Sequence, residues 1–275
     1  MTGVSVVIPT WNRSVLLEQA IRSALNQTHP PQEVLVCDDG STDGSEQVVR
    51  SFNDNRLIWL PGERSGRPAI PRNRGISASR GEWIAFLDDD DCWLPNKIEL
   101  QLERLQASGC FASCTDAFRC FPDEGRQGCL LGYETDTICF DDLLDENRII
   151  CSSVLVSSVA VKMAGGFPEA LPLRVIEDYA LWLRLLTMSD FAVVAQPLLE
   201  YRDSPQESIR KDGPAWPEQK RIVVNDFCDW GERQGYGLLS KVADVRRKCE
   251  NKKSFMERLA GYARQTVTML GLSLR

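Results

Sequence analysis

Four consecutive aspartates, Asp88, Asp89, Asp90 and Asp91, directly follow an apolar stretch at residues 83–87. The apolar stretch predicts a buried strand, whose end would deliver four carboxylates to one place. Two like charges about 4 Å apart repel by roughly 4 kcal/mol at an effective dielectric near 20. A cation would offset this repulsion, and oxygen ligands favour Mg²⁺ or Mn²⁺ held together with substrate phosphates. The alternative is a solvated acidic turn that ends the strand and caps the next helix.

The elements that must position these carboxylates are short apolar segments that alternate with amphipathic ones over residues 4–106. Near-continuous apolar strands separated by helices predict an α/β fold with a mainly parallel sheet covered by helices on both faces. The expected strands are 4–8, 34–37, 57–60 and 83–87, and the expected helices are 15–26, 44–52, 69–79 and 95–106.

Polar segments follow all four of these strands, namely 9–13 (PTWNR), 38–43 (DDGSTD), 62–67 (GERSGR) and the aspartate run. Because parallel strands end at the same edge of a sheet, we expect these segments to form one site. After residue 109 the pattern is less regular. Helices are expected at 140–147, 159–164 and 177–187, strands at 151–156, 191–195 and 198–201, and loops at 120–137 and 202–217.

The composition is that of an ordinary globular protein. Of 275 residues, 43% are hydrophobic and 26% are charged, which predicts one large domain or one domain with an appendage. No stretch approaches the ~18 apolar residues of a membrane-spanning helix, and the N-terminus has no signal-peptide pattern, so we expect a cytoplasmic protein. The ten cysteines form no CxxC pair, which predicts reduced thiols and disfavours disulfides and metal clusters.

Charge is distributed unevenly along the chain. The net charge is −7, yet residues 241–275 contain nine Lys or Arg against three acids, so residues 1–240 carry −13. A strongly acidic body argues against nucleic-acid binding. Between 254 and 274, apolar residues recur near helical spacing among basic ones, which predicts a basic amphipathic helix. This helix would lie peripherally on an anionic membrane, or pack on its own domain or on the second subunit of a homodimer.

Five segments in order carry a family resemblance: SVVIPTWNR, VLVCDDGSTDGS, PRNRGI, GEWIAFLDDDDCWLPNKIELQ and IEDYALWLRL. Together they resemble the family 2 inverting glycosyltransferases with the GT-A fold, over roughly residues 3–202. The resemblance implies a Rossmann-like, mainly parallel sheet flanked by helices, with a helical C-terminal appendage. The implied domain at 1–205 has a nucleotide-sugar-binding half at 1–109 and an acceptor-binding half at 110–205, followed by a loop and helical region at 206–275.

The activity implied by the resemblance is metal-dependent transfer of a sugar from a nucleoside diphosphate sugar to a hydroxyl of a glycan or lipid-linked acceptor. A UDP-sugar is the expected donor. In similar enzymes, the loop after the first strand lines the nucleoside pocket, and a carboxylate after the second strand accepts a hydrogen bond from the pyrimidine. These positions correspond to Pro9, Thr10, Trp11 and Arg13 in the first loop, and to Asp39 with its neighbour Asp38 in the second.

The resemblance also assigns the diphosphate and metal site. Arg72 matches an arginine that reaches the diphosphate or the pyrimidine, although Pro71 replaces the usual small residue before it. Asp88 and Asp90 match the two acids of the DxD motif, which makes Asp90 the expected ligand of Mg²⁺ or Mn²⁺ and Asp88 a sugar-nucleotide contact, as Asp89 is also expected to be. The cation would bridge the two phosphates and act as a Lewis acid.

Asp178 matches the family's general base, which takes the proton of the acceptor hydroxyl as the sugar carbon is attacked. Its position at the start of a helix would keep the carboxylate ionised. Glu177 and Trp182 are acceptor-side candidates, with core packing as the alternative for Trp182. Related enzymes often present a histidine near the position of Ser204, and the candidate replacements are Arg202, Arg210 and Lys211.

Two other functions stay open at this point. A sugar-phosphate nucleotidyltransferase shares the nucleotide-binding sheet, but it normally has a glycine-rich phosphate loop directly after the first strand, where this chain has residues 9–12 (PTWN). A non-catalytic nucleotide- or carbohydrate-binding relative needs no general base, and the match of Asp178 argues against it.

Overall fold

The computed structural model describes residues 2–204, 213, 215–235 and 237–249. The candidates Arg210 and Lys211 lie outside these described residues. Contacts divide the chain into two compact units, Met1–Val223 and Val224–Arg275. Among the described residues, no helix combines the length and hydropathy that crossing a membrane requires.

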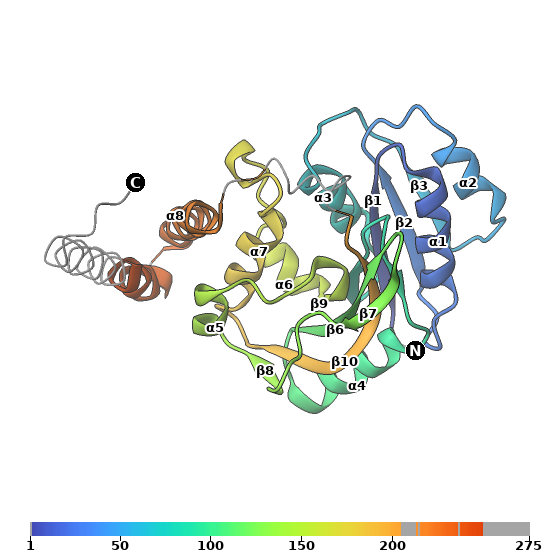
Figure 1. Cartoon of the computed structure of the whole chain (residues 1–275). Coiled ribbons are helices and arrows are strands. Elements are labelled where there is room, and N and C mark those ends of the chain that lie inside the picture. The colour runs from blue at the N-terminus through green and yellow to red at the C-terminus, as the bar shows by residue number, and fades with distance from the viewer. Residues whose placement is uncertain (1, 205–212, 214, 236, 250–275) are drawn as a thin grey trace, which may run out of the picture. The chain divides into compact units, whose positions relative to one another are not determined.

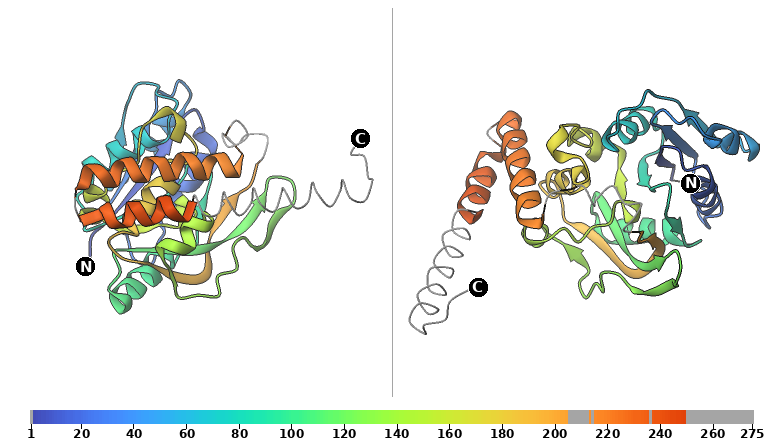
Figure 2. Two further views of the ribbon diagram at one scale, coloured as in Figure 1. Left: turned by 90° about the vertical axis from the view of Figure 1, so that its left-hand side faces the viewer. Right: turned by 45° about the horizontal axis from the view of Figure 1, so that its top comes forward.

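In the second unit, the described residues form two helices that run side by side (Figure 2). They are the end of α8 (Trp216–Gln234) and a helix at 237–249. An ion pair of 2.7 Å joins Arg246 to Glu232 across them. The basic amphipathic helix predicted at 254–274 lies outside the described residues.

A mixed sheet forms the centre of the first unit, in the order β3-β2-β1-β4-β9-β6-β10-β5 (Figure 1). Strands β1 to β4 are parallel, as their apolar sequences predict, and every residue of β1 and β2 is buried. In the other half, β9 is antiparallel to β4 and β6, whereas β10 is parallel to β6. The strands are β1 (Val4–Thr10), β2 (Glu33–Asp38), β3 (Leu57–Leu60), β4 (Trp83–Phe86), β5 (Cys92–Trp93), β6 (Ala112–Phe121), β7 (Gly125–Cys129), β8 (Thr137–Ile138), β9 (Leu155–Ser157) and β10 (Phe191–Arg202).

Helices cover both faces of the parallel strands (Figure 1). Successive side chains of a strand point to opposite faces, so Ile8 of β1 packs in one cluster with Leu17 of α1. On the other face, Val7 meets α3 so closely that a Cβ at Gly75 would lie 2.5 Å from Val7 Cγ1. The helices of this unit are α1 (Ser14–Leu25), α2 (Ser45–Ser51), α3 (Ala69–Ala78), α4 (Lys97–Ser108), α5 (Phe140–Asp145), α6 (Ser158–Met163) and α7 (Glu177–Leu185), with short 3₁₀ turns η1 (Cys151–Ser153) and η2 (Leu171–Leu173).

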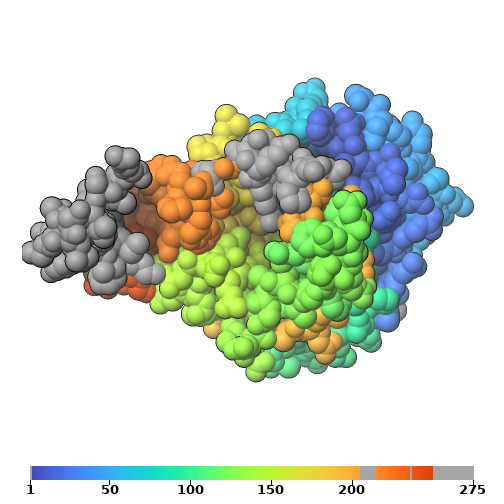
Figure 3. All heavy atoms as spheres, in the orientation of Figure 1, coloured from blue at the N-terminus to red at the C-terminus, as the bar shows by residue number. Residues whose placement is uncertain are grey.

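Three segments differ from the sequence-based expectation. Residues 120–137, expected as a loop, include the end of β6 and all of β7, which pair as a hairpin on the molecular surface (Figure 3). The strands expected at 191–195 and 198–201 are one strand, β10, whose pairing register shifts around Pro197 because proline cannot donate to the ladder. Residues 151–153, expected to begin a strand, form the turn η1 before β9.

Aromatic side chains hold α7 against β4. The ring centroid of Trp182 lies 6.1 Å from that of Phe86 and 5.8 Å from those of Phe167 and Phe191. Phe86 is the last residue of β4, two positions before the aspartate run, and Glu177 is the first residue of α7. Packing of these rings therefore fixes the amino end of α7 beside the carboxyl end of β4.

Lys97 gives the fold a testable pH dependence. Its ammonium is fully buried, donates to Gln101 Oε1 at 2.6 Å and lies 4.3 Å from the ring centroid of Trp93. Burial lowers the pKa of Lys97 from 10.5 to about 7. Between these pH values the unfolded chain binds a proton that the folded chain does not, so this residue makes stability rise with pH by up to about 1.4 kcal/mol per pH unit.

The variant Lys97→Met is expected to remove this contribution, because methionine fills the same space without a titrating group. Urea unfolding of both proteins at pH 7 and pH 9 measures it. The free energy of unfolding should rise between these pH values more in the native protein than in the variant. An equal rise in the two proteins would contradict the assigned pKa shift.

Candidate active site

A cavity of about 560 Å³ lies at the carboxyl ends of β1, β2 and β4 and at the amino end of α7. Six arginines and seven acids contribute to its walls, so its surface is suited to a ligand that carries both phosphate and hydroxyl groups. The charged lining residues are Arg13, Arg64, Arg67, Arg72, Arg174, Arg202, Asp39, Asp88, Asp89, Asp90, Glu177, Asp178 and Asp203.

Two of the four consecutive aspartates share one arginine. Asp89 is buried and accepts hydrogen bonds from Thr10 Oγ1 at 2.8 Å and Arg13 Nη1 at 3.1 Å, and the same nitrogen donates to Asp90 Oδ2 at 2.6 Å. Burial raises the pKa of Asp89 to about 7, with the charge of Asp90 adding to the shift and Arg13 opposing it. Burial also raises the pKa of Asp90. One guanidinium therefore leaves the cluster incompletely neutralised, a condition that favours a further cation.

The residues present fit a divalent cation that takes most of its ligands from a diphosphate. Among residues 2–204 and the other described segments, no three His, Cys, Asp or Glu side chains gather into a metal-binding group. The side chains of Asp88 and Asp90 are nevertheless each 28% exposed at the cavity wall. Mg²⁺ is commonly held by one or two carboxylates plus substrate phosphates. Asp91 is not part of this wall, because its buried carboxylate accepts from the backbone N–H of Arg202 at 2.9 Å.

Arg72 joins three elements at the base of the cavity. Its buried guanidinium donates from Nη2 to Asp88 Oδ1 at 2.6 Å and from Nη1 to Glu177 Oε1 at 2.7 Å. Burial by itself would lower the pKa of Arg72. The negative charges around it, including Asp88 and Glu177, outweigh this effect and raise the pKa well above its ordinary value. Burial raises the pKa of Glu177, with Arg72 opposing the shift. Arg72 therefore ties α3 to the end of β4 and to the start of α7.

Asp178 lies in the first turn of α7, half-buried at the cavity wall, and its Oδ1 accepts from the backbone N–H of Tyr179 at 2.7 Å. The positive end of the helix dipole stabilises the ionised form of a carboxylate in this position. Its neighbour Glu177 turns toward Arg72, so the two acids of the pair have different partners. Asp178 is thus the carboxylate of α7 that can face a hydroxyl group in the cavity.

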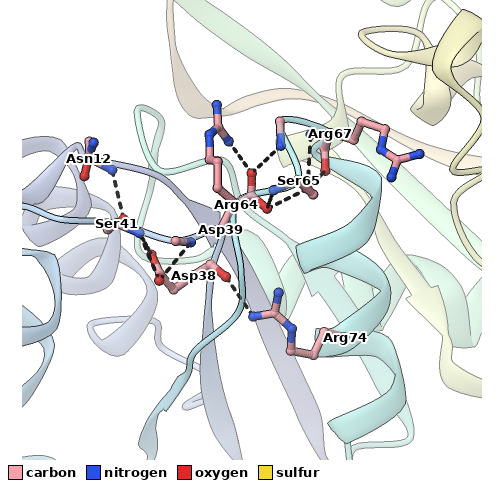
Figure 4. A network of polar contacts seen from close by, with 10 residues as sticks. Asn12, Asp38, Asp39, Ser41, Arg64, Ser65, Arg67 and Arg74 are labelled. Carbon is pink, nitrogen blue, oxygen red and sulfur yellow. Dashed lines mark hydrogen bonds and ion pairs between the residues drawn. The ribbon is translucent and has the colours of Figure 1, made fainter.

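The opposite wall holds an aromatic ring and a carboxylate. Trp11 is 44% exposed in the cavity, which excludes simple core packing for its ring. Asp39 is buried and accepts hydrogen bonds from Arg64, Ser65 and Gly66 in the segment before α3 (Figure 4). The left-handed Gly40 (φ 79°) allows this approach, because a Cβ there would lie 2.7 Å from the backbone nitrogen of Arg64.

The structure brings nearly all the sequence-predicted residues to this one cavity, but Asp38 and Trp182 do not line it. The carboxylate of Asp38 holds its own turn, because it accepts from the backbone N–H groups of Gly40 and Ser41 (Figure 4). Trp182 is fully buried in the aromatic core and does not line the cavity. The sequence-predicted residues that line the cavity are Pro9, Thr10, Trp11, Arg13, Asp39, Arg72, Asp88, Asp89, Asp90, Glu177 and Asp178.

Sequence reasoning missed several arginines of the cavity. Arg64 and Arg67 follow β3, and Arg174 precedes α7. The segment 62–67 after β3 is expected at the site as a strand end, but a single arginine in a polar loop gives no signal of its own. Arg202 and Ser204 also line the cavity, in the region where related enzymes often have a histidine.

Comparisons with known proteins show the family of the chain. The chain is 30% identical over 202 residues to the putative teichuronic acid biosynthesis glycosyltransferase TuaG of Bacillus subtilis, covering 72% of this chain and 78% of that protein. It is 29% identical over 241 residues to WfgD of Escherichia coli, described as a UDP-Glc:alpha-D-GlcNAc-diphosphoundecaprenol beta-1,3-glucosyltransferase, covering 87% and 92% respectively.

The fold is shared with a solved structure. S. aureus TarS 1-349 in complex with UDP-GlcNAc aligns with a TM-score of 0.69 at 18% identity, over 83% of this chain and 66% of that chain. This chain therefore spans about two thirds of the length of that structure. Residues 5–144 match the family model described as glycosyl transferase family 2. The chain belongs to glycosyl transferase family 2.

Proposed function

We propose that this glycosyltransferase moves a sugar from a UDP-sugar to a hydroxyl of a glycan or lipid-linked acceptor, with a divalent cation, by single displacement with inversion. The observation that carries the proposal is the shared cavity, in which the acids after β4 and the carboxylate of Asp178 face one space, with Arg72 between them. WfgD is named for a UDP-glucose donor, and TarS is solved with UDP-GlcNAc, which supports the donor class.

The donor's nucleoside would occupy the wall formed by Pro9, Thr10, Trp11 and Asp39. The indole of Trp11, which is 44% exposed, offers a stacking surface for a pyrimidine, and the carboxylate of Asp39 would accept a hydrogen bond from a ring N–H. Arg13 adds positive charge beside Asp89 and Asp90, at the side of the cavity where the diphosphate would lie.

The departing diphosphate develops negative charge as the bond between sugar and phosphate breaks. Arg72 supplies a fixed cation close to Asp88, and Asp90, with Asp88, would hold Mg²⁺ or Mn²⁺. When bound, the cation supplies Lewis-acid stabilisation of the leaving group. The protein's part is to hold these charges in place before the reaction, because Arg72 is buried and paired on two sides.

The acceptor hydroxyl would lose its proton to Asp178. At the same time the hydroxyl oxygen of the acceptor attacks the sugar carbon on the face opposite the diphosphate. One displacement of this kind inverts the anomeric centre. WfgD is named for a diphosphoundecaprenol-linked acceptor, which supports a lipid-linked glycan acceptor and peripheral membrane contact for this chain.

The test of the donor and metal assignments is calorimetric titration with UDP, GDP, CDP and dTDP, each with and without Mn²⁺. We expect UDP to bind, with an affinity that Mn²⁺ increases. Asp90→Ala should reduce the effect of Mn²⁺ by at least about tenfold, because it removes a carboxylate ligand. Asp123→Ala, an exposed acid in the turn between β6 and β7, is the control and should bind as the native protein does. Binding of UDP that is indifferent to Mn²⁺ would refute the metal assignment.

A further inference from the structure

Arg64 lies where a nucleobase would be expected to bind. Its guanidinium carbon is 3.6 Å from the ring centroid of Trp11, and its Nη1 contacts Asp39 Oδ2. Both partners line the cavity, and the ion pair joins an Arg64 side chain that is 41% exposed to an Asp39 side chain that is 5% exposed. A planar, donating group of this chain therefore already makes the two contacts that the proposed function assigns to a pyrimidine.

Donors of residues 64–66 fill the hydrogen-bonding capacity of the Asp39 carboxylate (Figure 4). Besides Arg64, the carboxylate accepts from Ser65 N at 3.0 Å, Ser65 Oγ at 2.6 Å and Gly66 N at 2.9 Å. An ionised carboxylate offers about four acceptor positions, so a further donor must replace one of these bonds. Three come from the main chain or from a short hydroxyl beside it, and the fourth comes from the long, partly exposed side chain of Arg64.

The stacking distance leads to the same conclusion. Non-bonded carbons are in contact at about 3.5–4.0 Å, so a ring inserted between the indole and the guanidinium would need them about 7 Å apart. They are 3.6 Å apart. A pyrimidine that stacks on this face of Trp11, on the side where Arg64 also meets Asp39, must therefore displace the guanidinium rather than slide beneath it.

We propose that Arg64 occupies the base subsite of the empty protein and exchanges with the pyrimidine of the nucleotide, taking its place again when the nucleoside diphosphate leaves. This inference rests on the proposed donor site. In the exchange, the pyrimidine N–H replaces the Arg64 donor on Asp39, and the base replaces the guanidinium on Trp11. The acceptor position of Asp39 that Arg64 fills is then never left without a donor, which avoids the desolvation cost of an unpaired acceptor. Return of Arg64 assists release of the product UDP.

The exchange predicts that removal of this cavity arginine increases the affinity for UDP rather than decreasing it. Arg64→Ala should bind UDP about three- to thirtyfold more tightly than the native protein, because the cation–π contact and the ion pair no longer have to be broken. The affinity for uridine should increase by a similar factor in Arg64→Ala. Because uridine has no phosphate, its affinity is insensitive to the lost positive charge. The affinity for CDP should increase by the same factor as that for UDP, because both ligands displace the same contacts of Arg64 with Trp11 and Asp39.

The experiment is calorimetric titration of UDP, CDP and uridine into the native protein, Arg64→Ala, Arg64→Lys and Arg50→Ala. Arg64→Lys keeps the charge but not the planar face, and it should show a smaller increase in affinity. It also serves if the alanine variant does not fold. Arg50 is an exposed helix residue paired with Glu46 and lies outside the cavity, so Arg50→Ala controls for net charge and should match the native protein. In a transfer assay, Arg64→Ala should also show a lower inhibition constant for UDP by the same factor.

The outcomes separate this inference from the proposed function. If the native protein binds UDP and Arg64→Ala binds UDP and uridine equally well or more weakly, Arg64 is not displaced and the inference is wrong, while the donor site stands. If neither the native protein nor any variant binds a nucleoside diphosphate, the proposed function fails, and this inference fails with it.

Discussion

Asp178→Asn is expected to lower kcat for sugar transfer by about 10²–10⁴-fold while the Kd for UDP stays unchanged. The amide has the same shape and can still accept the hydrogen bond that Asp178 Oδ1 receives from Tyr179 N at 2.7 Å. It cannot accept a proton from the acceptor hydroxyl at neutral pH. Transfer assays with UDP-sugar donors, together with calorimetric titration of UDP, measure the two quantities separately.

Asp141→Asn is the matched control, because Asp141 also lies in the first turn of a helix, α5, and is exposed outside the cavity. This variant should keep the native kcat. Ordinary transfer rates in Asp178→Asn would show that another group takes the proton. A loss of UDP binding in the same variant would show that Asp178 holds the donor rather than acting as the base.

Arg72→Met is expected to destabilise the protein by about 3–5 kcal/mol and to weaken UDP binding as well. Methionine leaves Glu177, whose side chain is 5% exposed, and Asp88, which is 28% exposed, without the guanidinium that pairs with both. Removal of one partner of a buried ion pair leaves an uncompensated charge in a medium of low dielectric constant. Urea unfolding at pH 7 measures the free energy of unfolding.

A second substitution tests that reason. Glu177→Gln in the Arg72→Met background should recover part of the lost stability, because it removes the charge that Arg72 no longer compensates. Arg22→Met is the control: its pair with Glu18 has side chains that are 63% and 43% exposed, and its loss should cost less than about 1 kcal/mol. A free energy of unfolding that is the same in Arg72→Met and Arg22→Met would contradict the assigned role of the buried pair.

The sequence by itself was sufficient for the parallel half of the sheet. Strands β1, β2 and β4 are covered on both faces, and their apolar runs are continuous for that reason. The polar ends of these strands could be assigned to one site because parallel strands end at one edge. Strand β6 could not be predicted, since its buried residues include Ser113, Thr115 and Asp116, whose hydrogen-bond partners come from other segments or from its own main chain.

The tertiary structure decided which of two neighbouring acids faces the cavity. Asp38 and Asp39 are adjacent and identical in type, yet one caps its own turn and the other reaches the segment after β3. Arg72 and Glu177 are 105 residues apart in the chain and meet only because ring packing holds α7 beside β4. Periodicity and residue type report local backbone preference and burial, whereas the pairing of side chains depends on how distant elements pack. The sequence therefore predicted the elements of the parallel half and the edge of the sheet that carries the site, and packing alone determined the contacts of Arg64 and Arg72 within it.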